Sequence, residues 1–257
     1  MNRFAITLAT LFLLVAGPAT AAAQSTLHRI LEAGAIRVGT TGDWNPMSMR
    51  DPATNTYQGF DIDVVTELAK DLGVGLVFVP TEWKTLVSGM VAGKYDISTS
   101  ASITPSRIRT VGFTRSYYQV GTVPVVMKKD ISQFASWEDI NRADVRVAVT
   151  LGTSFEQQVK HFFPKAEIKT VEAPARDFQE VLSGRAQVSI TSNLEASKLV
   201  RTYPQLAIVP VDQPRSPADL AFIAPQTDQV WINYLDHWIR IKANQGFFLE
   251  LQEKWMP

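Results

Sequence analysis

Short segments rich in β-branched residues alternate with helix-patterned segments along most of this chain, and this alternation limits the folds that it can adopt. The clearest helical stripe covers residues 61–72, where apolar side chains recur at a helical period and Asp61 is placed to cap the first turn. Strands are predicted on either side, at residues 35–39 and 75–80. Strands joined by helices pair in parallel, so the pattern predicts an α/β protein with mostly parallel sheets flanked by helices.

The alternation continues to the end of the chain. Further strands are predicted at residues 95–99, 120–127, 145–150, 187–190, 206–209 and 220–224. Further helices are predicted at residues 83–92, 230–245 and 247–255. Two connections are suited to crossings between lobes, one near residues 117–122 and one near residues 210–217, where three prolines interrupt the pattern.

These two crossings divide the chain into two lobes. We predict a first lobe made of residues 24–118 and 213–257, with a second lobe, residues 119–212, inserted into it. The periodicity supports the alternation of strands and helices but does not by itself require this division. Two lobes joined by a two-strand hinge enclose a cleft, and ligands bind such sheets at the carboxyl ends of the strands.

The first 23 residues have the pattern of a secretory signal peptide. Arg3 supplies the positive charge, residues 4–16 form an apolar run, and small residues at 21–23 fit a signal peptidase site, so the mature chain is predicted to start at Gln24. The apolar run is shorter than the ~20 residues that span a bilayer, which makes an uncleaved anchor the weaker alternative. The sequence therefore predicts export to the periplasm.

The absence of cysteine and the balance of charge exclude several classes of function. Without cysteine the chain has no disulfide, no thiolate metal site and no lipid-bearing cysteine. Its histidines, His28, His161 and His237, lack ligand spacing, so no metal site is predicted. Basic and acidic residues number 25 each, which leaves no basic surplus for nucleic acid or an anionic membrane.

Several ordered motifs make the chain recognisable. They are Arg29-Ile-Leu-Glu-Ala-Gly-Ala-Ile-Arg-Val-Gly-Thr-Thr, Gly59-Phe-Asp-Ile-Asp-Val, Ser102-Ile-Thr-Pro-Ser-Arg107 and the tail Asn244-Gln-Gly-Phe-Phe-Leu-Glu-Leu-Gln-Glu-Lys-Trp255. Together they resemble the extracellular solute-binding proteins of family 3 across nearly the whole mature chain. The resemblance implies the two-lobed type II periplasmic binding fold, a small carboxylate-bearing ligand, and an ABC permease of the inner membrane as a partner.

One enzyme branch of that family is especially similar. Thr40-Thr-Gly-Asp-Trp-Asn-Pro46 and Val79-Pro-Thr-Glu-Trp83 resemble the periplasmic cyclohexadienyl dehydratases, which convert prephenate or arogenate to aromatic products and need no cofactor. Family members bind a ligand carboxylate with the arginine that matches Arg107. Trp44 and Trp83 fall where the family has aromatic cleft walls, and ordinary core packing is the alternative for both.

Hydroxyl groups flank the predicted position of Arg107. Ser100 and Ser102 follow a predicted strand and come shortly before Arg107. At such a place a guanidinium can form two parallel hydrogen bonds to a carboxylate. Thr153 opens a helix, whose free backbone N–H groups attract anions. Each residue has a structural alternative: an exposed arginine, two turn serines, and a capping box for Thr153-x-x-Glu156.

Glu195 separates the two functions that the resemblance allows. It matches the glutamate thought to protonate the departing hydroxyl in the dehydratases, and such an acid needs a raised pKa. Ser192-x-x-Glu195 is also a capping box, so a purely structural role is the alternative. Ser192 stands where amino-acid binders usually carry an aspartate for the ligand's ammonium group. An uncharged residue there argues against a zwitterionic amino acid and favours a keto acid or a dicarboxylate.

A receptor and a dehydratase therefore both remain open. The receptor would close around its ligand and dock on a permease, whereas the dehydratase would use Glu195 as general acid. The motifs at residues 40–46 and 80–83 favour the dehydratase, whereas the altered Ser192-Asn193 stretch departs from both patterns, and we favour the receptor by a narrow margin. A monomer is predicted, because the hinge must move freely. The predicted ligand-binding residues are Trp44, Trp83, Ser100, Ser102, Arg107, Thr153 and Ser192.

Overall fold

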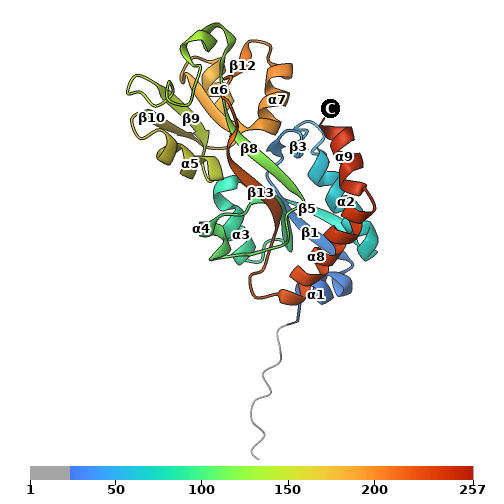
Figure 1. Cartoon of the computed structure of the whole chain (residues 1–257). Helices are drawn as coiled ribbons and strands as arrows, with labels where there is room; N and C mark the ends of the chain where they lie inside the picture. Colours follow the sequence, from blue (N-terminus) through green and yellow to red (C-terminus); the bar gives the residue numbers. More distant parts are fainter. Residues whose placement is uncertain (1–23, 257) are drawn as a thin grey trace, which may run out of the picture.

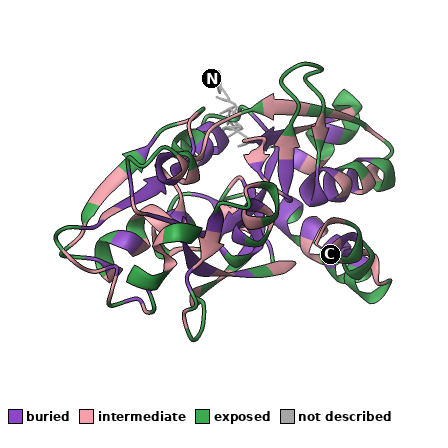
Figure 2. Cartoon of the chain, turned by 90° about the horizontal axis from the view of Figure 1, so that it is seen from above, coloured by how far each residue is buried: buried purple, intermediate pink, exposed green. Residues whose placement is uncertain are grey.

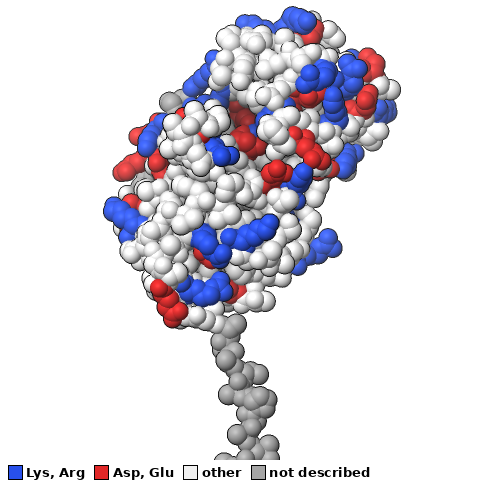
Figure 3. Space-filling model, turned by 180° about the vertical axis from the view of Figure 1, so that it is seen from behind, with Lys and Arg blue, Asp and Glu red and all other residues white. Residues whose placement is uncertain are grey.

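The computed structural model describes residues 24–256, which form two α/β lobes joined at a waist (Figure 1). The predicted signal peptide, residues 1–23, lies outside the described residues. Lysine and arginine are interspersed with aspartate and glutamate over the face shown in Figure 3. This mixing agrees with the balanced charge of the sequence.

One path of hydrogen-bonded strands runs through both lobes, in the order β10-β9-β11-β8-β13-β6-β1-β5. Its strands are β1 (Ala35–Thr40), β5 (Gly75–Pro80), β6 (Ile97–Ser102), β8 (Tyr118–Met127), β9 (Arg146–Thr150), β10 (Glu167–Val171), β11 (Val188–Ser192) and β13 (Arg215–Ala224). Off this path, β7 (Gly112–Phe113) pairs with β13 and β12 (Leu206–Ile208) pairs with β8.

Parallel and antiparallel pairs are mixed in this sheet. As the alternation predicts, β1 is parallel to β5 and β6, and β9 is parallel to β10 and β11. Strands β8 and β13 are antiparallel to each other and to their outer neighbours β11 and β6. The reason is connectivity, because these two long strands carry the chain into the second lobe and back (Figure 1). The lobe boundaries at 118/119 and 212/213 fall close to where these strands begin, and they stay a prediction.

Helices pack against the strands of each lobe. They are α1 (Thr26–Ala33), α2 (Phe60–Leu72), α3 (Leu86–Val91), α4 (Pro105–Ile108), α5 (Ser154–Phe162), α6 (Asp177–Leu182), α7 (Asn193–Thr202), α8 (Gln229–Asn244) and α9 (Phe247–Trp255), with 3-10 turns η1 (Trp83–Thr85) and η2 (Lys128–Gln133). The predicted helix at 83–92 is therefore the turn η1 followed by α3.

Five short strands escape the sequence pattern. They are β2 (Asp43–Trp44), β3 (Ser48–Arg50), β4 (Tyr57–Gln58), β7 and β10. The first three form a small antiparallel sheet beside the cleft and are too short to show a period. Strand β10 lies at the sheet edge and is mostly half-exposed, so it lacks the apolar run of a buried strand.

Each lobe has buried apolar cores of its own, which Figure 2 shows as buried segments inside an exposed surface. Phe60, Phe222 and Trp231 are fully buried in the first lobe. Phe134 and Phe163 are fully buried in the second. Because the chain has no disulfides, these cores supply the stability of the lobes.

Asp61 was expected to cap helix α2, and that prediction is wrong. The helix begins directly after Gly59, whose φ of 135° suits glycine, and Asp61 lies inside its first turn, 2% exposed. Its carboxylate accepts hydrogen bonds from Ser100 Oγ at 2.7 Å and Tyr117 Oη at 3.3 Å. Burial raises the pKa of Asp61 to about 7, although these bonds oppose the rise. Tyr117 Oη also accepts from the Ser100 N–H at 2.6 Å, and together these bonds hold Ser100, φ 47°, at the cleft.

Replacing Asp61 by Asn should reduce the pH dependence of stability. Because burial raises the folded-state pKa of this carboxyl from 3.8 to about 7, its contribution is present below pH 3.8 and is lost as the pH rises toward 7, by at most ~1.4 kcal/mol per pH unit. Urea denaturation between pH 4 and 8 should therefore give a shallower fall in the free energy of unfolding for the variant than for the wild type. Equal slopes would contradict the assignment.

Candidate active site in the interlobe cleft

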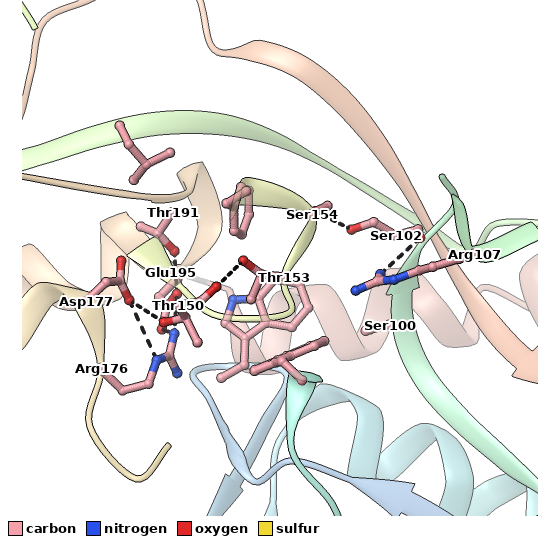
Figure 4. A pocket seen from close by; sticks show the side chains of 14 residues that line it. Ser100, Ser102, Arg107, Thr150, Thr153, Ser154, Arg176, Asp177, Thr191 and Glu195 are labelled. Carbon is pink, nitrogen blue, oxygen red and sulfur yellow. Dashed lines mark hydrogen bonds and ion pairs between the residues drawn. The ribbon is translucent and has the colours of Figure 1, made fainter. Parts of the chain in front are cut away.

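A cavity lies between the lobes, at the carboxyl ends of β6, β9 and β11, with about 420 Å³ of empty space that includes open solvent (Figure 4). Its lining residues are Trp44, Trp83, Ser100, Ser102, Arg107, Thr150, Thr153, Ser154, Phe155, Arg176, Asp177, Ile190, Thr191 and Glu195. Ligand sites are often found in such clefts between lobes. Figure 4 shows Arg107 on one side of the cavity, which we call the Arg107 end. Arg176, Asp177 and Glu195 lie on the other side, which we call the Glu195 end.

Arg107 is a buried cation. It lies on the short helix α4, whose cap Thr104 accepts from the Arg107 backbone N–H at 3.3 Å, and it is 8% exposed. Its guanidinium donates to the carbonyl oxygens of Ser102 at 3.1 Å and Gly152 at 3.2 Å. Among the described residues, no carboxylate forms an ion pair with it, and burial lowers its pKa to about 10. An unneutralised buried cation favours an anionic ligand.

Hydroxyl groups from both lobes lie beside Arg107. Ser154 Oγ donates to Ser102 Oγ at 3.1 Å across the cleft. Thr153 lines the cavity and also caps α5, since its hydroxyl accepts from the Glu156 N–H at 3.4 Å. The Glu156 carboxylate accepts from the Gly152 N–H at 2.9 Å, one residue before the cap, so only the Thr153 half of the predicted capping box is present. Structural and lining roles coexist at Thr153.

Glu195 points its carboxylate into the cavity. Ser192 caps helix α7 by accepting from the Glu195 N–H at 3.1 Å, but the Glu195 carboxylate does not complete a capping box. It contacts Arg176 Nη2 at 2.8 and 3.1 Å instead, and accepts from the Thr191 hydroxyl. Only the cap half of the structural alternative is therefore present. Ser192 itself is fully buried and is not among the residues that line the cavity.

The pKa of Glu195 is raised to about 7. Burial is the largest cause, because the side chain is 3% exposed and desolvation penalises its charged form. Arg176 opposes the rise, whereas the nearby carboxylates of Asp177 and Asp43 add to it. Burial and like charge outweigh the ion pair, so this group can hold a proton near neutral pH.

Arg176 is one of several lining residues that the sequence analysis did not predict, together with Asp177 and Ser154. It is 8% exposed and crosses from the second lobe to the first, where it donates to the Asp43 carbonyl and lies 3.4 Å from the Asp43 carboxylate. Within the second lobe it contacts Glu195 and lies 3.7 Å from Asp177. Burial lowers its pKa, but these three carboxylates outweigh burial and the net shift is upward. The available signal was an Arg-Asp pair after β10, a strand that was not predicted.

Trp44 and Trp83 form one wall of the cavity. Their rings meet edge to face, with centroids 5.8 Å apart and planes at 80°. Trp83 Nε1 donates to the Asp43 carboxylate at 3.0 Å, which fixes the indole and aligns the acceptor of Arg176. An unsaturated ring can stack on such a surface.

Direct contacts hold the lobes together around the cavity. Beyond the Arg176–Asp43 and Ser154–Ser102 contacts, Lys84 pairs with Glu172 at 2.7 Å. Gly152 has φ 80° and packs so closely on Lys84 that a Cβ there would lie 2.4 Å from its backbone. A side chain at position 152 would therefore hold the lobes apart.

Most of the site residues predicted from the sequence line the same cavity. The cavity brings together Trp44, Trp83, Ser100, Ser102, Arg107, Thr153 and Glu195. The residues described contain no group of three or more acidic, histidine or cysteine side chains that could hold a metal ion. Across residues 24–256, no helix has both the length and the apolar character needed to cross a membrane.

Known proteins resemble the chain over most of its length. The model of the bacterial extracellular solute-binding proteins, family 3, matches residues 36–257. A cyclohexadienyl dehydratase from Pseudomonas aeruginosa PAO1 is 33% identical over 244 residues, which cover 95% of this chain and 90% of that protein.

Two solved structures of ancestral proteins are also similar. One is an amino acid-binding protein described as a precursor of cyclohexadienyl dehydratase, with TM-score 0.84, 37% identity, and 91% of this chain and 100% of that chain covered. The other is an ancestral cyclohexadienyl dehydratase, with TM-score 0.56, 44% identity, and 91% and 98% covered.

Replacing Arg176 by Gln should destabilise the fold strongly. The change leaves the Glu195 and Asp177 carboxylates buried without their cation, and removing one partner of a buried pair costs about 3–5 kcal/mol. Urea denaturation at pH 8 should show this loss, and the double variant Arg176→Gln/Glu195→Gln should recover part of it.

Arg185→Gln is the matched control, because Arg185 is itself exposed and its partner Glu180 keeps Lys169 as a second cation. Its loss of stability should be much smaller. A loss for Arg176→Gln no greater than that of the control would contradict the assigned role of Arg176.

Proposed function

The chain belongs to the bacterial extracellular solute-binding proteins, family 3, and on that premise we propose that its cleft closes around a small organic acid whose carboxylate binds Arg107. The observation that carries this proposal is the buried guanidinium of Arg107, which has carbonyl contacts but no acidic partner among the described residues. A ligand carboxylate would supply the missing charge with parallel hydrogen bonds. The adjacent start of α5 adds backbone N–H groups that favour an anion.

The family is one of extracellular proteins, and we further propose a periplasmic location after removal of residues 1–23. In a receptor role, the closed form would dock on an ABC permease. Differential affinity of the ligand for the closed state would drive that closure. The likeness to an ancestral amino acid-binding protein supports a binding role of this kind.

Glu195 favours a second function, the dehydration of a cyclohexadienyl acid. Passive binding of an organic acid that lacks an ammonium group gives no reason to bury a protonatable carboxyl in the ligand cavity at the cost of desolvation. A general acid needs such a group, with a pKa near the working pH. The 33% identity to a cyclohexadienyl dehydratase supports the same function.

The reaction needs one proton and a fixed orientation. Glu195 would transfer its proton to the ring hydroxyl of a prephenate-like acid as the C–O bond breaks and water leaves. The bond between the ring and its carboxylate also breaks, and carbon dioxide leaves. The electron pair of that bond stays with the ring and completes its aromatic system. The carboxylate that remains on Glu195 is stabilised by Arg176, 2.8 Å away. Aromatisation drives the reaction, so the protein supplies position and acid catalysis.

Replacing Glu195 by Gln should abolish turnover while leaving ligand binding intact. The amide keeps the shape of the side chain but cannot donate the proton, so kcat for prephenate should fall at least ~100-fold. Phenylpyruvate formation, followed by its absorbance, measures turnover, and Glu138→Gln, an exposed glutamate paired with Arg215, is the control. An inactive wild type that organic acids stabilise against heat would exclude the dehydratase and leave the receptor. Equal turnover in Glu195→Gln would exclude Glu195 as the acid.

The pH profile gives an independent measurement. Because burial raises the pKa of Glu195 to about 7, the competent protonated form is present below that pH and is lost above it. We therefore expect kcat to be level below pH 6 and to fall about tenfold per pH unit above pH 8. A kcat that rises with pH through this range would contradict the acid role.

A further inference from the structure

We propose that the Arg107 end of the cavity selects a 2-oxo acid over the corresponding 2-amino acid, and that the Ser102 hydroxyl donates to the 2-oxo oxygen. This inference rests on the proposed function, since it assumes that a carboxylate binds Arg107. It deepens that function by naming the group that must stand next to the carboxylate.

The argument begins with the acceptors in contact with Arg107 and Ser154. The carbonyl oxygens of Ser102 and Gly152 both accept from the Arg107 guanidinium. The Ser102 hydroxyl oxygen accepts from Ser154. Each of these oxygens therefore already accepts one hydrogen bond from a neighbouring donor. A ligand ammonium group has three donors and no acceptor, so it would have to share these oxygens with Arg107 and Ser154, next to the positive charge of Arg107.

The hydrogen-bond donors at the Arg107 end, in contrast, are partly free. Ser154 gives its proton to Ser102 at 3.1 Å, which leaves the Ser102 proton free to point at a ligand. The guanidinium of Arg107 also has N–H groups beyond the two that reach carbonyls. A carboxylate next to a carbonyl presents only acceptors, which is the complement of this set. Thr153 adds nothing here, because its own proton goes to the Thr150 carbonyl at 2.7 Å.

The distribution of charge in the cavity also favours a 2-oxo acid over a 2-amino acid. The carboxylates that line the cavity, Asp177 and Glu195, belong to the Glu195 end, and Figure 4 shows them across the cavity from Arg107. Both are also engaged, Glu195 by Arg176 and Asp177 by the Thr150 hydroxyl at 2.9 Å. An α-ammonium group beside Arg107 would therefore be a second buried cation without a counter-ion.

The arrangement also fixes the direction in which the ligand lies. Its 2-oxo carboxylate would occupy the Arg107 end and its ring would lie along Trp44 and Trp83. The leaving hydroxyl would then face Glu195. Among cyclohexadienyl acids, this selects the 2-oxo form, prephenate, over the 2-amino form, arogenate.

Three aromatic acids that cannot react test the selection without any turnover. Phenylpyruvate, 3-phenylpropanoate and L-phenylalanine share a ring and a carboxylate and differ only in the group at carbon 2. Titration calorimetry at pH 6.5 should give the tightest Kd for phenylpyruvate, with 3-phenylpropanoate about tenfold weaker, the effect of one hydrogen bond. L-Phenylalanine should bind at least ~100-fold more weakly than phenylpyruvate.

Ser102→Ala tests the donor, with Ser106→Ala as a control because Ser106 bonds Gln157 outside the cavity lining. Both ligands lose what the Ser154–Ser102 contact contributes to closure, and phenylpyruvate should lose about tenfold more affinity than 3-phenylpropanoate. Binding of 3-phenylpropanoate shows that the variant is folded. An equal loss for both ligands would overturn the assignment of Ser102.

The outcomes separate this inference from the proposed function. L-Phenylalanine binding within threefold of phenylpyruvate, or no binding of phenylpyruvate, would overturn the inference, whatever prephenate does. The predicted order of affinities without turnover of prephenate would support the inference and exclude the dehydratase.

Discussion

Burying a cation without a counter-ion is the constraint on which this cleft depends. Arg107 is held between the lobes by two carbonyl oxygens, one from each lobe, and no described carboxylate neutralises it. The unliganded protein therefore bears a desolvation cost that an anionic ligand removes. Since one of the two carbonyls, Gly152, comes from the second lobe, the guanidinium is held from both sides only when the lobes meet. Binding and closure are thus coupled through one side chain.

The second buried guanidinium extends that coupling to the acid. Arg176 joins Glu195 in the second lobe to Asp43 in the first, and Asp43 in turn accepts from Trp83. Opening the cleft would separate Arg176 from Asp43 and admit water to Glu195. Because burial is the main cause of its raised pKa, Glu195 would then become an ordinary ionised carboxylate. The group can therefore serve as an acid only in the closed form, when the substrate is shielded from water.

The sequence predicted the alternation of strands and helices, and with it the edge of the sheet where the cavity lies. It also predicted seven of the fourteen lining residues, because these follow strands with clear patterns or sit in recognisable motifs. Arg176 could not be found this way. The strand before it, β10, is an exposed or half-exposed edge without an apolar run. The partner of Arg176, Asp43, lies 133 positions away, an interaction that no local pattern records. The Ser192-x-x-Glu195 spacing was ambiguous for a different reason, since the cap needs only the Ser192 hydroxyl and leaves the carboxylate free.

A receptor and an enzyme can share this scaffold because both need the Arg107 end and only the enzyme needs the Glu195 end. The cavity is electrically polar, with an unpaired cation at one end and a cation shared by three carboxylates at the other. A ligand anion at the first end neutralises Arg107 and leaves the excess negative charge at the second end uncompensated. That excess favours the proton on Glu195. Binding a 2-oxo carboxylate at Arg107 therefore acts in the same direction as closure, because each increases the fraction of Glu195 that is ready to donate.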